Sequence, residues 1–216
     1  GKSQSGAGKR PLERRAGGTV RVPRLGRITP KQHGAWSAKF ETLKSLTRNY
    51  NRLRQVKSAE ELDWLRIGAY FSDLGMAALR DGVKPGLNAR ELGDVVERAY
   101  IRHGAVHVIH YFGVTSMQAP DLGVPRQFPR VRRVQPGDVV VAEITAAFWD
   151  HPGQVLRSFA LGEPNKLYRD LHAAADAAFD AIASVLKAGV TPAEVIEASG
   201  VIEDAGFTII DDLLHG

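Results

Sequence analysis

The sequence lacks cysteine altogether and holds only two methionines and three tryptophans in 216 residues. Without cysteine, disulfide bonds, thiolate metal ligands and cysteine nucleophiles are excluded. There is also no run of about 18 apolar residues, and no basic segment leads into the apolar stretch of a secretory signal. Hydrophobic residues still make up 44% of the chain, enough for one sizeable core. We therefore expect a cytoplasmic protein with no membrane partner.

Acidic residues are scarce at the start of the chain. Residues 1–57 hold 15 Lys or Arg against two acids, a charge of +13, whereas residues 58–216 hold 14 against 22, a charge of −8. Gly, Pro, Ser and Arg dominate residues 1–34, and such a composition buries too little surface to offset the ordering entropy. We expect 1–57 to be a basic, largely disordered head or the remnant of an N-terminal domain. Nucleic-acid binding by this head is the less favoured alternative.

The pattern changes at Ser58, where a helix is predicted to begin. Ser58 and Glu61 have the spacing of a capping box. Apolar residues then recur at three- and four-residue spacings, and Gly82 stands where a helix C-terminal glycine is expected. The sequence therefore predicts a second domain over residues 58–216.

Two segments that lie 107 residues apart share one pattern, Leu79-Arg-Asp-Gly-Val83 and Leu186-Lys-Ala-Gly-Val190. Each is followed by a capping box, a helix that runs to a glycine (Gly104 or Gly206), and a β-rich segment, 106–109 or 207–210. The boxes are Asn88 with Glu91 and Thr191 with Glu194. The repeat predicts a pseudo-symmetric α+β domain with its helices on one antiparallel-rich sheet. The second copy stops six residues after its β-rich segment, so we expect an incomplete second half.

Residues 134–161 have the pattern of a β-hairpin. Val134-Gln-Pro-Gly-Asp138 has the composition of a turn, β-branched residues follow, and the segment WDHPG reverses the chain. By the two-residue period of a strand, Val141, Glu143 and Thr145 share one face, as do Gln154, Leu156 and Ser158 on the second strand. The sequence does not give the register that would decide whether these faces coincide.

Three histidines, His103, His107 and His110, have the three- and four-residue spacings of ligands on a helix. Gly104 is expected to end the helix between them, so we prefer to interpret them as ordinary histidines rather than as a metal site. His110 and Tyr111 follow the predicted strand and are candidates for lining a substrate pocket.

Three features occur in the order found in one known family. They are the helix start KSAEELDWLRIGA, the repeat, and the hairpin that follows Gly137-Asp138 and ends in Arg157, Phe159 and Gly162. Together they resemble the methionine aminopeptidase, aminopeptidase P and creatinase family over about residues 55–216. The resemblance implies the pita-bread fold. In the peptidases of that family it implies two divalent metal ions (Mn, Co, Fe or Zn) that activate a water against a peptide carbonyl.

Residue by residue, the resemblance implies that Glu143 and Gln154 stand where the family has two metal-binding aspartates, and that His215 stands for a metal-binding histidine. It implies catalytic roles for His215 and Arg157, with Arg157 supporting Glu143 or substrate charge. Gln154 offers a neutral amide where a paired metal site needs charge. The two metal-binding glutamates of the family have no counterpart in the sequence.

The resemblance therefore implies a hydrolase of the Xaa-Pro aminopeptidase or creatinase type, acting on small peptides or other small molecules with carbon–nitrogen bonds, and the substituted ligands predict a degenerate metal site. The alternative is a non-catalytic binding module of the same fold, or one that forms a homodimer to cover a sheet edge.

Overall fold

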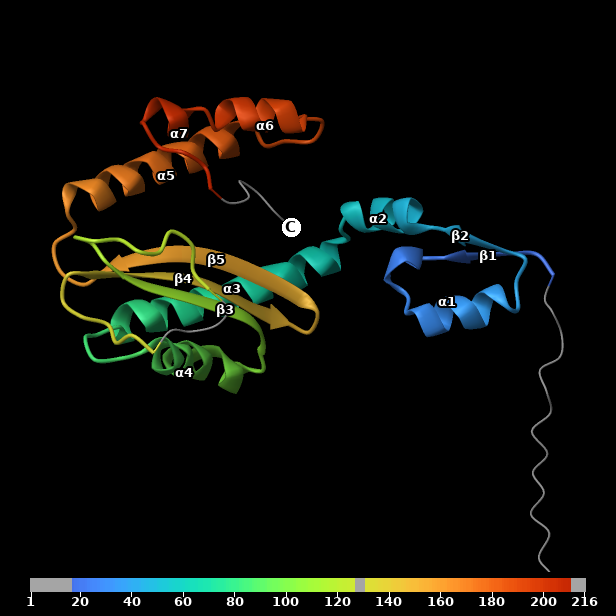
Figure 1. Cartoon of the computed structure of the whole chain (residues 1–216), viewed down its shortest axis with the longest axis horizontal. Coiled ribbons are helices and arrows are strands. Elements are labelled where there is room, and N and C mark those ends of the chain that lie inside the picture. The colour runs from blue at the N-terminus through green and yellow to red at the C-terminus, as the bar shows by residue number, and fades with distance from the viewer. Residues whose placement is uncertain (1–16, 127–130, 211–216) are drawn as a thin grey trace, which may run out of the picture. The chain divides into compact units, whose positions relative to one another are not determined.

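A computed structural model describes residues 17–126 and 131–210. The chain divides into two compact units, the first ending at Ala59 and the second beginning at Glu60 (Figure 1). No helix within the described ranges is long and apolar enough to cross a lipid bilayer.

The first unit is built on a pair of parallel strands, β1 (Thr19–Val22) and β2 (Thr42–Ser45), joined through η1 (Leu25–Arg27) and α1 (Pro30–Ser37) and followed by α2 (Thr47–Gln55). A reciprocal capping box between Thr29 and Gln32 starts α1, with Pro30 at its first position. The prediction of disorder is therefore wrong for residues 17–34. The basic, Gly- and Pro-rich composition favours disorder there, whereas the capping box at Thr29 is a local signal for a helix. Residues 1–16 lie outside the described part.

The second unit opens with two helices that follow the predicted pattern. α3 (Ala59–Gly82) begins immediately after Ser58 and ends at the predicted glycine. α4 (Ala89–Tyr100) begins at the predicted capping box, in which the Asn88 side chain accepts from the Glu91 amide and Glu91 accepts from the Asn88 amide. A short turn, η2 (Ile101–His103), then ends at Gly104, whose φ of 87° suits glycine.

The sheet of this unit has three antiparallel strands in the order β3 (Val106–Ser116), β4 (Asp138–Phe148) and β5 (His151–Ala160). The predicted hairpin is confirmed, with Trp149 and Asp150 reversing the chain between β4 and β5. In the register, Glu143 pairs with Leu156 and Thr145 with Gln154. The two polar faces predicted separately for β4 and β5 are therefore one face of the sheet.

The opposite face of the sheet packs against α3 and α4 and forms the hydrophobic core. Its central members are Leu79, Leu92, Val96, Tyr100, Val140, Ala142, Ile144 and Ala146. The backbones of α3 and β5 are in close contact where the two elements cross. A Cβ atom on Gly68 would lie only 2.2 Å from the His151 carbonyl oxygen, so this position requires glycine. At this crossing the Ser72 hydroxyl donates to the Gly153 carbonyl at 2.6 Å and accepts from the Ala146 amide at 2.8 Å. α3 is thereby fixed across both strands of the hairpin.

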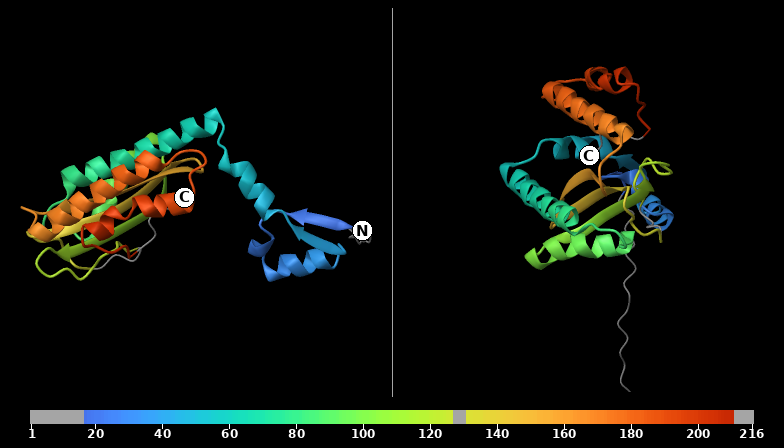
Figure 2. Two further views of the ribbon diagram at one scale, coloured as in Figure 1. Left: turned by 90° about the horizontal axis from the view of Figure 1, so that it is seen from above. Right: turned by 90° about the vertical axis from the view of Figure 1, so that its left-hand side faces the viewer.

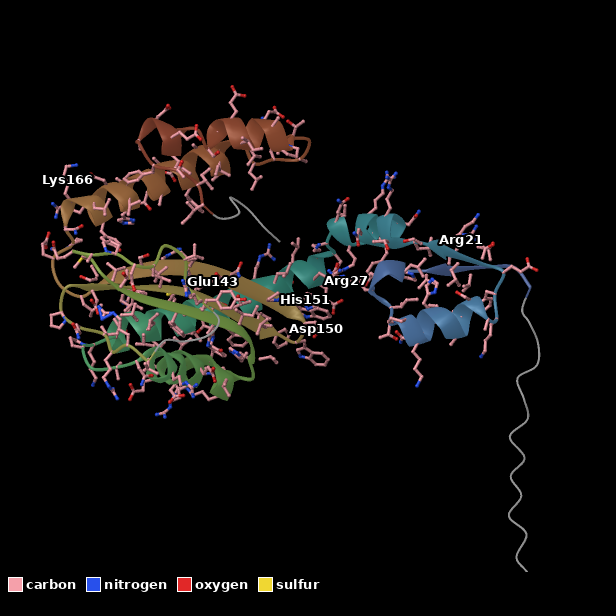
Figure 3. The ribbon with its side chains drawn as sticks, in the orientation of Figure 1. Arg21, Arg27, Glu143, Asp150, His151 and Lys166 are labelled. Carbon is pink, nitrogen blue, oxygen red and sulfur yellow. The ribbon has the colours of Figure 1, made fainter. Side chains whose placement is uncertain are left out.

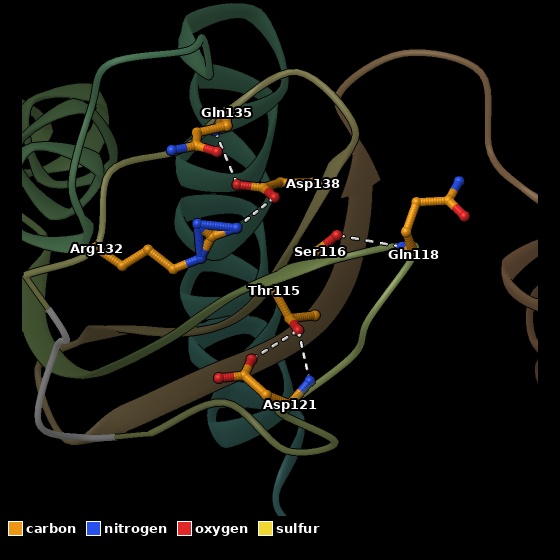
Figure 4. A network of polar contacts seen from close by, with 7 residues as sticks. All are labelled: Thr115, Ser116, Gln118, Asp121, Arg132, Gln135 and Asp138. Carbon is orange, nitrogen blue, oxygen red and sulfur yellow. Dashed lines mark hydrogen bonds and ion pairs between the residues drawn. The ribbon is translucent and has the colours of Figure 1, made fainter.

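One ion pair and several hydrogen bonds close the end of the sheet where β3 finishes and β4 begins (Figure 4). The buried Asp138 carboxylate accepts from Arg132 at 2.5 Å and from the Gln135 amide at 2.8 Å. On β3 the Thr115 hydroxyl donates to Asp121 at 2.8 Å. The Gly-Asp pair that opens the hairpin thus has a structural role in holding the preceding turn.

The second copy of the repeat supplies α5 (Lys166–Val185), α6 (Pro192–Ala198) and α7 (Val201–Asp204), drawn on the other side of the sheet from α4 (Figures 1 and 2). The Thr191–Glu194 capping box is confirmed. The predicted single helix to Gly206 breaks at Ser199 and Gly200, and residues 207–210 form no strand. A strand requires a partner, and these four residues have none among the described residues.

Candidate functional site

The hairpin site lies on the sheet face away from α3 and α4. One row across the three strands holds Tyr111, Glu143 and Leu156, and the next holds Ile109, Thr145 and Gln154. Gln154 donates its side-chain N–H to Glu143 Oε1 at 2.6 Å. Glu143 is half-buried in the middle of the sheet (Figure 3), while Gln154 is exposed. The sequence therefore brings both predicted metal positions together, with a direct contact between them.

The chemistry of this pair can be tested against a paired metal centre. Hard and borderline divalent cations are held by carboxylate and carbonyl oxygens. Here Gln154 turns its N–H, a donor, towards the only carboxylate of the pair, and the reverse orientation would place two oxygens against each other. The described hairpin residues therefore supply one carboxylate and one amide, and the amide nitrogen faces the carboxylate. His215, the third predicted ligand, lies outside the described residues.

Arg157 lies on the other face of the sheet. It pairs with Ala142, the residue before Glu143 on β4. Because successive strand residues point to opposite faces, Arg157 and Glu143 lie on opposite faces of the sheet. Its exposed side chain donates to the Leu156 carbonyl at 2.7 Å. The expected support of Glu143 by Arg157 is therefore wrong, and a role of Arg157 towards a substrate stays a prediction.

His110 and Tyr111 are separated in the same way. Tyr111 shares the face of Glu143, whereas His110 pairs with Ile144 on the face covered by helices. The expectation that both line one pocket is wrong because they are consecutive residues of β3.

His110 instead belongs to a cluster with Glu97 and His107, and one ligand atom from each lies within 4.8 Å of the other two. Glu97 Oε1 is 3.5 Å from His110 Nδ1 and 3.7 Å from His107 Nδ1. The cluster opens into a groove that Asp94 and Arg126 also line. His103, the third histidine of the sequence pattern, is not part of this group.

A β-bulge explains why the sequence did not predict this cluster. Residues three apart on a regular strand point to opposite faces. The register of β3 shifts between His107 and Ile109, so that His107 pairs with Ala146 and His110 with Ile144, both on the helix-covered face. Val108 is the extra residue. No feature of the sequence marks a bulge here, and the three- and four-residue spacings of the histidines match only a helical face.

The environment of His110 favours its neutral form. Its side chain is 4% exposed, and its Nε2 atom lies 2.8 Å from the hydroxyl of the fully buried Tyr100. Burial lowers the pKa of His110 to about 4, with the neighbouring His107 adding to the effect. Burial likewise raises the pKa of Tyr100, and the charge of Glu97 raises it further. At neutral pH the cluster thus holds an uncharged imidazole and a protonated phenol.

Comparison with known proteins assigns the chain to a family. Residues 63–216 match the model of metallopeptidase family M24. The chain belongs to this family. The Xaa-Pro dipeptidase of Pyrococcus furiosus is 23% identical over 167 residues, which are 76% of this chain and 47% of that protein. The family resemblance inferred from the sequence is therefore confirmed.

Solved structures show the same fold. The prolidase from Pyrococcus furiosus superposes with a TM-score of 0.78 at 20% identity, covering 87% of this chain and 55% of that one. The X-Pro aminopeptidase from Thermotoga maritima gives a TM-score of 0.74 at 18% identity, covering 87% and 53%. Dipeptidase PepE from Mycobacterium ulcerans gives a TM-score of 0.75 at 23% identity, covering 88% of this chain and 50% of that one. The α+β pita-bread fold is thus confirmed, and the chain spans about half the length of these relatives.

Proposed function

We propose that this chain is a peptide-binding member of the M24 fold whose hairpin does not hold a catalytic pair of metal ions. The observation that carries the proposal is the 2.6 Å hydrogen bond from Gln154 to Glu143. The pair presents one carboxylate whose charge is partly engaged by an amide donor. A paired centre needs several oxygen ligands directed at the cations.

The ligand class follows from the relatives and from the face itself. The relatives are named as an Xaa-Pro dipeptidase, a prolidase and an X-Pro aminopeptidase. On this chain the corresponding face offers Tyr111 and the 48% exposed Leu156 on either side of Glu143. The buried Thr145 hydroxyl beside them has no hydrogen-bond partner among the described residues. Apolar side chains around a few polar groups suit a small peptide with a free amino terminus facing Glu143.

The test combines an assay with a binding measurement. We expect no hydrolysis of an Ala-Pro dipeptide above the buffer rate with Mn²⁺, Co²⁺ or Zn²⁺. The same dipeptide should shift NMR resonances of Tyr111 and Leu156 in the wild type, and E143A should weaken that binding. Metal-dependent hydrolysis that E143A abolishes would overturn the proposal. An Ala-Pro amide peptide blocked at its amino terminus is the matched ligand control.

Dimerisation is a second candidate because β5 is an edge strand of the sheet in the described part of the chain. It exposes Gln154, Leu156, Arg157 and Ser158. Edge strands with free backbone groups pair readily with another chain. Light scattering of the wild type and of L156K tests this: a dimer that the lysine dissociates supports it, and a monomeric wild type contradicts it.

A further inference from the structure

The groove between α4 and β3 holds a set of ligands on the opposite face of the sheet from Glu143. We propose that Glu97, His107 and His110 form a mononuclear site for a divalent transition-metal ion of the zinc type. Two imidazoles and one carboxylate, with a fourth position open, are a donor set that Zn²⁺ takes in proteins. The site is distinct from the hairpin pair and does not depend on the function proposed for it.

The spacing of the ligand atoms fits one small ion. Zinc bonds of 2.0–2.1 Å in a tetrahedron place neighbouring ligand atoms about 3.4 Å apart. Glu97 Oε1 stands 3.5 Å from His110 Nδ1 and 3.7 Å from His107 Nδ1. Both distances lie within a few tenths of an ångström of that value, and all three ligand atoms lie within 4.8 Å of one another. The partly exposed Glu97 and His107 side chains can move to complete the closure around the ion.

An unpartnered nitrogen is the second, independent observation. The His110 side chain is 96% buried, and its Nδ1 atom has no hydrogen-bond partner among the described residues. A buried polar atom without a partner costs about 1–3 kcal/mol. This atom points at Glu97, so a cation held between them satisfies both groups.

Tyr100 supplies the outer support that such a site needs. Its hydroxyl lies 2.8 Å from His110 Nε2, the ring nitrogen that does not face Glu97. When Nδ1 binds a metal, Nε2 carries the proton and donates it to the tyrosine oxygen, which fixes the tautomer and the ring orientation. The same hydroxyl lies 3.4 Å from His107 Nδ1, a long contact that metal binding replaces.

The rest of the groove is compatible with a bound cation. Asp94 lies one helical turn before Glu97 on α4 and adds a second negative charge to the lining. Arg90 and Arg126 also line the groove and add two positive charges, which balance Asp94 and Glu97 until a cation binds. The three ligands come from the C-terminal half of α4 and from the bulged part of β3, two elements joined by the tight turn at Gly104.

Zinc chloride titrated into the chelator-treated chain by calorimetry tests the site. We expect one equivalent to bind with a Kd of micromolar or tighter, and both H107A and E97Q to weaken it at least tenfold. These positions are partly exposed, so the variants fold. Co²⁺ should give the intense visible absorption of tetrahedral coordination in the wild type and lose it in H107A.

Two matched variants separate this site from other metal binding. H172A removes an exposed histidine that lies beside Asp176 on α5, and E143A removes the hairpin carboxylate. Both should bind zinc like the wild type. Absence of zinc binding below 100 µM, unchanged binding in H107A and E97Q, or a loss confined to E143A or H172A would each overturn the proposal.

Discussion

Gln154 on β5 donates its side-chain N–H to Glu143 on β4 at 2.6 Å, across the pair of strands that the M24 fold uses for its hairpin. A carboxylate and an amide replace the two carboxylates that the family resemblance leads one to expect. A hydrogen bond between them is stable without any ion, whereas two adjacent carboxylates repel unless a proton or a cation lies between them. The hydrogen bond therefore holds the two side chains together with no cation between them.

Replacing Gln154 by aspartate should make the hairpin pH-sensitive. In Q154D two neighbouring carboxylates repel at pH 8, and we expect a loss of about 1 kcal/mol in the free energy of unfolding. The loss should disappear near pH 4, where one carboxyl of the pair is protonated and can donate to the other. Urea unfolding of wild type and Q154D at both pH values measures this difference in the free energy of unfolding. Q154A is the control, since it removes the hydrogen bond without adding charge, and its loss should not vary with pH.

His110 should make the metal-free protein less stable in mild acid. Its pKa is lowered from 6.5 to about 4 in the folded chain, so its neutral form contributes stability above pH 6.5 that is lost as the pH falls towards 4. Between pH 7.5 and 5 the contribution should fall by about 2 kcal/mol. The difference in unfolding free energy between wild type and H110Q, measured in urea with a chelator, isolates it. A difference that is constant over this range contradicts the prediction, and H172Q provides the exposed control.

The folded elements of the second unit could largely be predicted because their signals are local. The capping boxes at Asn88 and Thr191 and the turn after Phe148 each depend on a few neighbouring residues. The same kind of signal occurs at Thr29, in a segment whose basic composition by itself favours disorder. The prediction of a strand at residues 207–210 was wrong for the opposite reason, since a strand depends on a partner that can be distant in the sequence.

The candidate sites depended on register, which the sequence does not encode locally. Glu143 and Gln154 were placed on matching faces only once β4 and β5 were paired. The cluster of Glu97 with His107 and His110 needed one more non-local fact, the extra residue Val108 in β3. Without that bulge His107 and His110 would lie on opposite faces of the sheet.

Ser72 should contribute more to stability than its exposed counterparts. Its hydroxyl bridges the Ala146 amide and the Gly153 carbonyl, and the side chain is 1% exposed. S72A leaves both backbone groups without this partner, and we expect a loss of about 2–3 kcal/mol in the free energy of unfolding. S184A, which removes an exposed hydroxyl bonded to Ala181 of its own helix, should cost less than about 0.5 kcal/mol. Equal effects of the two variants in chemical denaturation would contradict the bridging role.

The two capping boxes should act independently, each on its own helix. N88A removes the acceptor of the Arg90 and Glu91 amides and should destabilise α4 by about 1 kcal/mol. Because α4 carries Glu97 and Tyr100, the same variant should weaken zinc binding in the groove. T191A removes the acceptor of the Glu194 amide and should act on α6 alone.

Amide hydrogen exchange followed by mass spectrometry separates these effects. We expect faster exchange in peptides covering 89–100 for N88A and in peptides covering 192–198 for T191A, with little change in the other helix. T191A should leave zinc binding unchanged, because α6 contributes no residue to the cluster of Glu97, His107 and His110. Faster exchange of both helices in either variant would mean that the two copies of the repeat open together rather than as separate units.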